Sequence, residues 1–400
     1  MNPSVQPAIQ STGTKPRYLA VLADLCALPH RGAATAGERQ ALEILEHHLK
    51  SLGANTERQP FRTQKTYLTT LGWILGCIIT GLLLVPYWGL WAALVTIAGA
   101  VSGWLFFDWR LSPASLLPPR VWSANLLGKV SSDAAKFRLI LMAHFDTAPI
   151  SALYRSALIR RFKSSLLTTL ALMVLASLLV VLAVFVRSTA LDALRYLLAL
   201  YFVAQGVIAS VDFLRFGYTN GAADNGTGVA TAIGVFERLV HTSIPGWQMD
   251  VLLTSGEEVG MIGARAFYET HKAELGPNVY VLNFDDVVAG HLRLFARTGI
   301  LSSIRYQNPL LEAAKAAASS DPCFSTVQSA EWTTGDFDTA CFARGGVPCL
   351  TIGSLDESGG MPHLYRPEDT LGNVDTSQVE QAIAFGEATV RKLAASELPK

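Results

Sequence analysis

The stretch LILMAHFDTAP, residues 139–149, combines a run of apolar residues with a polar corner. The run LILMA is typical of a strand that is buried on both faces of a sheet. His144 and Asp146 follow it directly. In open α/β sheets, ligands bind beyond the carboxyl ends of the strands. The stretch therefore predicts an α/β fold with a functional site at the end of this strand.

Three later segments that we expect to form strands also end at polar residues. These strands are predicted at residues 249–255, 278–284 and 347–353, and helical patterns separate them. Strands that alternate with helices predict a mainly parallel mixed sheet with helices covering both faces. The residues that follow the strands include Glu257, Glu258, Asp285, Asp286 and His363.

A further polar corner lies in the loop GAADNGTG, residues 221–228, which places Asp224 just before a predicted helix. With His144, the corners bring two histidines and several carboxylates to one edge of the sheet. Imidazole and carboxylate groups are zinc ligands, and no cysteine accompanies them. The sequence therefore predicts a site for a pair of divalent metal ions.

Four apolar stretches approach or reach the length of about 20 residues that crosses a bilayer. They span residues 68–85, 89–107, 166–186 and about 196–211. The links PYW and RSTALDALR are short, so the stretches pair into two helical hairpins, and nearby Trp and Tyr residues are typical of a membrane interface. Core helices of a large soluble protein are the alternative, but the third stretch contains no charged residue, which favours a membrane.

The hairpins interrupt one catalytic domain and do not separate two. Excising the second hairpin would join the His144 corner almost directly to the Asp224 loop, and surface loops tolerate such insertions. We expect a helical N-terminal part at 1–66, a hairpin at 67–108, strands with the first metal corner at 109–153, a hairpin with a basic flank at 154–218, and the rest of the domain at 219–400.

Composition agrees with membrane attachment. Charged residues make up 16% of the chain, against about 25% in soluble domains, and the mean hydropathy is +0.31. The formal net charge of zero does not suit a nucleic-acid partner. Five scattered cysteines without a CxxC pair indicate reduced thiols, and we expect no secretory signal because the N-terminus lacks an apolar segment.

The sequence motifs at these polar corners, and their order along the chain, resemble those of the M28 family of dizinc aminopeptidases. The resemblance runs from about residue 18 to the C-terminus, without the hairpins. It depends on HxD at 144–146, GAxDNxxG at 221–228, Glu257-Glu258, NxD at 283–285, and His363 followed by Asp369.

This resemblance implies two zinc ions per chain. His144 and Glu258 would bind one ion, Asp285 and His363 would bind the other, and Asp224 would bridge both. A shared carboxylate offsets the repulsion between two dications about 3.5–4 Å apart.

The same resemblance assigns Glu257 as the general base, which takes a proton from the attacking water and passes it to the leaving amine. Asp146 would accept the other ring N–H of His144 and fix its tautomer. A non-prolyl cis peptide bond is implied between Asp224 and Asn225. The implied function is a membrane-bound aminopeptidase acting on peptides.

One segment departs from the family pattern. TTGDFDTACFARGGVP, residues 333–348, contains Asp336 and Asp338 but no histidine, where many members have an SDH-like sequence. Because that loop shapes the substrate pocket, carboxypeptidase-like or glutaminyl-cyclase-like chemistry is the alternative.

Two further classes are less well supported. A non-catalytic peptidase-fold scaffold should lack metal ligands, which are present here. A transporter should have ionisable residues within its spans, yet the spans offer only Arg195, near one end, and Gln205.

Basic residues are biased towards the ends of the hairpins that face the catalytic domain. Lys and Arg excess marks the cytoplasmic side of a membrane. We therefore expect an integral protein of the plasma or inner membrane with four spans and a cytoplasmic catalytic domain; the oligomeric state is not predicted. The domain-side residues are Arg58, Arg62, Lys65, Arg110, Arg120, Arg155, Arg160, Arg161, Lys163 and Arg215, against Arg187 and Arg195 in the far links.

Overall fold

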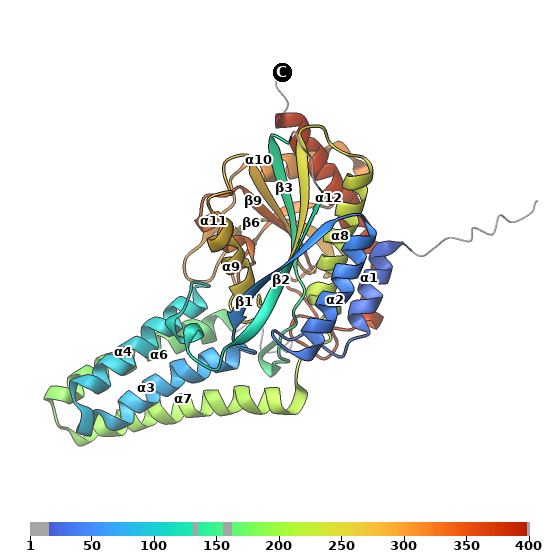
Figure 1. Cartoon of the computed structure of the whole chain (residues 1–400). Helices are drawn as coiled ribbons and strands as arrows, with labels where there is room; N and C mark the ends of the chain where they lie inside the picture. Colours follow the sequence, from blue (N-terminus) through green and yellow to red (C-terminus); the bar gives the residue numbers. More distant parts are fainter. Residues whose placement is uncertain (1–15, 131–134, 155–161, 398–400) are drawn as a thin grey trace, which may run out of the picture.

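The computed structural model describes residues 16–130, 135–154 and 162–397 (Figure 1). Within these residues, nine strands form one sheet in the order β1-β2-β4-β3-β5-β9-β6-β7, with β8 beside β6. The central strands β4, β3, β5 and β9 are parallel, and β1, β2, β6 and β7 add antiparallel pairings. The strands are β1 (Asn55–Thr63), β2 (Val121–Val130), β3 (Phe137–His144), β4 (Trp247–Thr254), β5 (Val279–Phe284), β6 (His291–Thr298), β7 (Ile304–Arg305), β8 (Gln328–Trp332) and β9 (Cys349–Leu355).

Helices cover both faces of this sheet, as predicted (Figure 1). Five helices pack on one face, and α9 and α11 pack on the other. The first group is α1 (Arg17–Cys26), α2 (Ala36–Ser51), α8 (Gly228–His241), α10 (Pro309–Ser320) and α12 (Thr376–Glu397); the second is α9 (Ile262–His271) and α11 (Thr339–Arg344).

Strand β3 shows why the opening stretch decides this architecture. Successive side chains of a strand point to opposite faces. Leu139 and Leu141 join the core beneath the first group of helices, whereas Ile140 and Met142 join the core beneath α9 and α11. All four are fully buried. A strand with two covered faces must be apolar at every position, which is the pattern that LILMA displays.

The two apolar hairpins form a separate four-helix bundle that projects from one end of the domain (Figure 1). Its helices are α3 (Tyr67–Trp88), α4 (Leu90–Phe107), α6 (Phe162–Phe185) and α7 (Thr189–Phe216). All four are long and apolar enough to cross a membrane.

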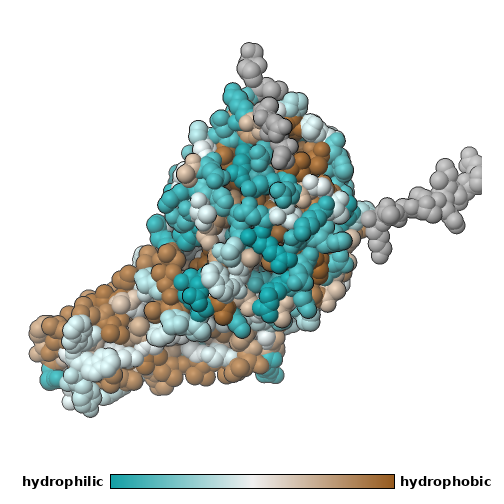
Figure 2. Space-filling model, viewed as in Figure 1, coloured by the Kyte–Doolittle hydropathy of each residue, from teal (hydrophilic) through white to brown (hydrophobic). Residues whose placement is uncertain are grey.

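The outer surface of the bundle is apolar, in contrast to the catalytic domain (Figure 2). Buried residues make up 39% of the most apolar window of α6 and 17% of that of α7. Residues such as Leu178, Leu200 and Val207 are therefore exposed. An apolar surface of this extent is typical of a lipid-facing or partner-facing surface.

Several local predictions differ from the structure. Strands β1, β6, β7 and β8 were not predicted; in β1 only Phe61 and Thr63 are buried, so it lacks the apolar pattern of a central strand. The link RSTALDALR is mostly helical, because α7 begins at Thr189 and contains Arg195. The basic residues Arg155, Arg160 and Arg161 lie outside the described residues.

Helix packing in the first hairpin can be tested at Gly81. A Cβ atom at Gly81 would collide with the Thr96 side chain and lie 2.7 Å from the carbonyl oxygen of Ala92. We expect Gly81→Ala to destabilise the bundle by about 1–3 kcal/mol, because overpacking separates α3 from α4. The melting temperature of the detergent-solubilised protein measures this effect.

Gly76→Ala is the matched control, because a Cβ atom there meets nothing within 4 Å. It should leave the melting temperature unchanged or raise it, since alanine is the better helix former. Equal destabilisation by the two substitutions would contradict the close approach of α3 and α4.

Candidate metal centre

His144, the last residue of β3, lies at the centre of the predicted site. Its side chain is 2% exposed. The Nε2 atom lies 3.2 Å from Oδ1 of Asp224 and 3.7 Å from Oδ2 of Asp285. Asp224 comes from the loop before α8, and Asp285 follows β5. One nitrogen and two carboxylate oxygens at these separations can hold one metal ion.

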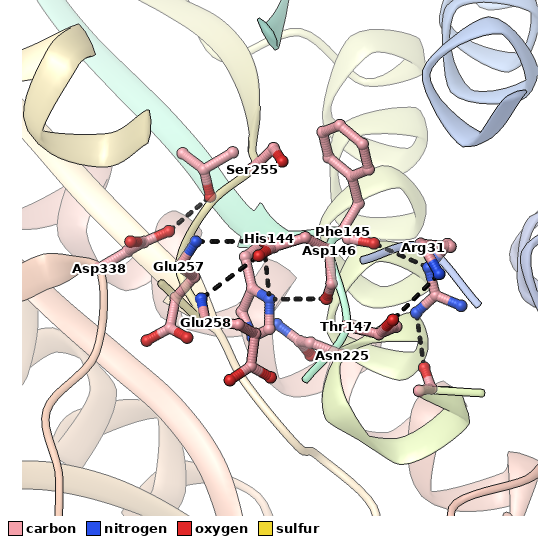
Figure 3. Close-up of polar contacts among 12 residues, drawn as sticks. Arg31, His144, Phe145, Asp146, Thr147, Asn225, Ser255, Glu257, Glu258 and Asp338 are labelled. Atoms are coloured by element: carbon pink, nitrogen blue, oxygen red, sulfur yellow. Dashed lines mark hydrogen bonds and ion pairs between the residues drawn. The ribbon is translucent and has the colours of Figure 1, made fainter. Parts of the chain in front are cut away.

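Asp146 connects this corner to the next strand. Its carboxylate accepts hydrogen bonds from the backbone N–H groups of Glu257 (3.2 Å) and Glu258 (3.3 Å) (Figure 3). The Nδ1 atom of His144 lies 3.2 Å from the main-chain oxygen of Asp146 and 3.5 Å from its carboxylate. The main-chain oxygen is thus the nearer partner of the imidazole, whereas the carboxylate chiefly orients the Glu257-Glu258 pair.

Glu257 and Glu258 follow β4 and are both buried. Each offers a carboxylate oxygen within 4.8 Å of a ring nitrogen of His144, so these three residues form a second group that could hold a metal ion. Oε1 of Glu258 is buried and has no hydrogen-bond partner among the described residues. A buried carboxylate oxygen without a partner is unfavourable unless a cation binds there.

Two residues hold the Asp224 loop. Asp369 accepts hydrogen bonds from the backbone N–H groups of Ala223 (2.6 Å) and Asp224 (3.3 Å). Asn225 donates to the carbonyl oxygen of Phe284 (2.9 Å) and so connects this loop to the Asp285 corner. The peptide bond between Asp224 and Asn225 is cis, as predicted.

Arg31 is a residue that the sequence reasoning missed. It is fully buried in the loop between α1 and α2. Its guanidinium donates to the carbonyl oxygen of Phe145 at 2.7 Å (Figure 3). It also donates to the carbonyl oxygens of Asn220 and Gly221, each at 2.7 Å. Arg31 therefore joins the His144 corner to the start of the Asp224 loop. No local pattern in the sequence marks such a role.

The segment that departs from the family pattern also reaches the site. Asp338 is buried, and its carboxylate accepts a hydrogen bond from Thr254. Its other oxygen is buried without a partner in the described part of the chain. Burial raises the pKa of Asp338 to about 6, although the nearby His144 counteracts this shift. The sequence analysis noted this acid only as part of a variable loop.

The predicted ligand His363 is not a member of either group of described residues that could hold a metal ion. It lies in the loop after β9, and its charged neighbours are Arg366 and Glu368. Burial, followed by Arg366, lowers its pKa. Its Nδ1 atom is buried without a partner among the described residues. A place for His363 on a metal ion stays a prediction.

His144 lies near the ligands of both predicted ions. Its Nε2 atom is within 4 Å of carboxylate oxygens of Asp224 and Asp285, and Glu258 belongs to a second group around the same imidazole. Strands β4 and β5 both pair with β3, so the strand order brings both corners to His144. The assignment of each carboxylate to one zinc ion stays a prediction.

The electrostatics of the cluster indicate missing positive charge. Within the described residues, no Lys or Arg forms an ion pair with Asp224, Glu257, Glu258 or Asp285. Burial raises the pKa values of Glu257 and Glu258 well above the ordinary value of a glutamate. It also raises the pKa of Asp285 to about 8. Burial alone would lower the pKa of His144, but Asp285, Asp146 and Asp224 raise it well above its ordinary value. The donor set therefore fits zinc.

Stability of the metal-free protein should depend on pH. Folding raises the pKa of Asp285 from 3.8 to about 8. A group with a raised pKa stabilises the folded state at low pH, and this stabilisation is lost as pH rises through the folded pKa. The shifts of His144, Glu257 and Glu258 have the same sign. We expect the melting temperature of chelated protein to fall between pH 4 and about pH 8.

The zinc-loaded protein is the comparison. Zinc favours the ionised carboxylates and neutral imidazole, so the gap in melting temperature between loaded and chelated protein should widen as pH rises. A constant gap over this range would contradict a metal site built from these groups.

Comparison with known proteins supports the predicted family. Residues 206–387 match the model of Peptidase family M28. The match includes Asp224, Glu257, Glu258 and Asp285, and it begins within α7, after the His144 corner. A sequence search finds no match among curated proteins.

Solved structures share the fold at low sequence identity. A Zn-dependent exopeptidase from Parabacteroides distasonis is 14% identical with a TM-score of 0.55, covering 94% of this chain and 96% of that one. A zinc aminopeptidase from Bacillus subtilis (13%, 0.56, 94% and 94%) and a glutaminyl cyclase from an Acidobacteriales bacterium (14%, 0.56, 98% and 100%) are similar. The family match and the shared fold confirm the resemblance to the M28 zinc peptidases that the polar corners predicted.

Proposed function

We propose that this protein is a membrane-bound dizinc aminopeptidase that removes N-terminal residues from peptides. The observation that carries the proposal is the buried group of His144, Asp224 and Asp285 beside Glu257 and Glu258. His144 and Glu258 would hold one zinc ion, and Asp285 and the predicted ligand His363 would hold the other. Asp224 would be shared between them.

Glu257 is the residue best placed for proton transfer. When bound, zinc supplies a Lewis acid that polarises the scissile carbonyl and makes water a better nucleophile. Burial raises the pKa of Glu257, which makes its carboxylate a stronger base. It would take a proton from the attacking water and deliver it to the amide nitrogen as the C–N bond breaks.

The lining of the pocket supports recognition of a peptide amine and not of a carboxylate. A cavity of about 210 Å³ adjoins His144, Asp224, Glu257 and Asp285. Among the described residues that line it there is no Lys or Arg, which a terminal carboxylate would need. The excess of carboxylates suits a terminal ammonium group.

Glutaminyl cyclisation is the second candidate, because cyclases share this fold and also act on a free N-terminus. A peptide panel distinguishes the reactions: an aminopeptidase releases a free amino acid, whereas a cyclase acting on N-terminal Gln releases ammonia and leaves the peptide bonds intact. Both activities should disappear with a chelator, and an N-terminally blocked peptide should not react.

The role of Glu257 can be separated from metal binding. We expect Glu257→Gln to retain zinc and to lose activity by about 10²–10⁴-fold, which is the usual contribution of a positioned acid or base. Glu258→Gln should lose zinc together with activity. Zinc content and turnover of the purified proteins measure these effects, and Glu274→Gln, on the surface, is the control. Equal zinc loss in the Glu257 and Glu258 variants would make Glu257 a ligand.

We also propose that the bundle of α3, α4, α6 and α7 spans a membrane with the catalytic domain on its cytoplasmic side. Both hairpins begin and end at the domain (Figure 1). Arg195 is buried within the bundle, where it pairs with Asp192 and donates to the carbonyl oxygen of Leu82. Of the described basic residues, only Arg187 remains in a far link. The bias of basic residues towards the domain side supports this orientation.

A reporter fused after Lys400 tests the orientation. A cytoplasmic reporter should be active there and alkaline phosphatase should be inactive, because the C-terminus follows the catalytic domain. Activity of the phosphatase alone would reverse the orientation. Recovery of the protein in the soluble fraction would exclude the spans.

A further inference from the structure

The pocket beside the metal ligands is only partly built from the catalytic domain. Trp109, Tyr154 and Phe162 are among the residues that line it. These three residues belong to the bases of the two hairpins: Trp109 lies two residues after α4, Tyr154 ends a short turn before the second hairpin, and Phe162 is the first residue of α6. Trp332, Phe337 and Tyr365 of the catalytic domain also line the pocket, and we call these six residues the aromatic wall.

Ring contacts join three residues of this wall. The rings of Tyr154 and Tyr365 meet edge to face with centroids 4.5 Å apart, and the rings of Tyr154 and Phe162 lie 5.2 Å apart. Tyr154 therefore joins the base of α6 to the loop after β9. The indole Nε1 of Trp109 is buried without a partner in the described structure.

Polar contacts attach the first hairpin firmly at this place. The carbonyl oxygen of Trp109 accepts hydrogen bonds from Arg344 (2.8 Å) and Arg265 (3.2 Å). The carboxylate of Asp108 accepts from the backbone N–H and the hydroxyl of Ser302, both at 2.7 Å. A tether that served only as an anchor would not need to be held against the substrate pocket.

From these contacts we infer that the preferred substrates are peptides whose apolar N-terminal segment lies at the membrane surface. The inference rests on the proposed function and extends it to a substrate class. Phe162 both lines the pocket and begins an apolar helix that would enter the bilayer. The pocket thus lies where the apolar bundle meets the domain. A cavity of about 210 Å³ holds little more than the terminal residue, so the following residues would extend along the hairpin bases into the interface.

The test uses the full-length protein in lipid vesicles and two peptides of equal length with the same N-terminal leucine. One continues with apolar residues that partition into the vesicles, and the other continues with serine and glycine. Leucine p-nitroanilide, a small soluble substrate, reports the proposed function independently. We expect kcat/KM for the apolar peptide to exceed that for the polar peptide by about tenfold or more.

Variants distinguish recognition by the wall from simple enrichment of the peptide in the membrane. Phe162→Ala should reduce the ratio of the two kcat/KM values by roughly tenfold, because an apolar contact is lost, and Phe162→Leu should restore much of it. Trp91→Ala is the matched control, because Trp91 is an exposed aromatic of α4 at the far end of the bundle. It should leave the ratio unchanged.

Three results would overturn the inference: equal kcat/KM values for the two peptides, a ratio that Phe162→Ala does not alter, or equal effects of Phe162→Ala and Trp91→Ala. Failure of the wild-type protein to hydrolyse leucine p-nitroanilide and both peptides would instead refute the proposed aminopeptidase function.

Discussion

The hydrogen bonds from the backbone of Glu257 and Glu258 to the buried carboxylate of Asp146 tie together the ends of β3 and β4. The rest of the site depends on this contact. The parallel pairing of β3 with both β4 and β5 brings three polar corners to one edge, as the geometry of α/β sheets requires. Asp146 then sets the direction of the Glu257-Glu258 pair relative to His144.

A group of buried carboxylates is unstable without opposing charge. Asp224, Glu258 and Asp285 gain no Lys or Arg partner within the described residues, and the side-chain hydrogen bonds given for the Arg31 guanidinium go to carbonyl oxygens. The fold therefore holds its acids with backbone and amide contacts and leaves their charge for a cation to balance. Metal binding and folding stability should consequently be coupled.

The hairpins are more than additions to a finished domain. Each hairpin is inserted in a connection beside the pocket. Asp108 accepts a hydrogen bond from Ser302 and Trp109 accepts one from Arg344, and these contacts hold the base of the first hairpin against the catalytic domain. Ile300 and Leu301 of the domain also pack against the apolar core of the bundle. Insertion of a membrane anchor at a substrate-binding loop offers a way to select substrates by their location.

Local patterns in the sequence determined the apolar central strands, the helices that cover them, the four long apolar helices and the residues at the polar corners. Such features depend on the hydrophobic period, the segment length and the residue types within short windows of sequence, and these can be recognised without knowledge of tertiary contacts. Only the tertiary structure showed that Arg31 connects the His144 corner to the Asp224 loop and that aromatic residues from the bases of the hairpins line the pocket. Arg31 and the carbonyl oxygen of Gly221 are 190 residues apart in the chain, and no local pattern encodes a contact over that separation. The polar edge strand β1 was not predicted for a related reason. It forms a strand because it pairs with β2, and its own sequence lacks the apolar pattern of a central strand.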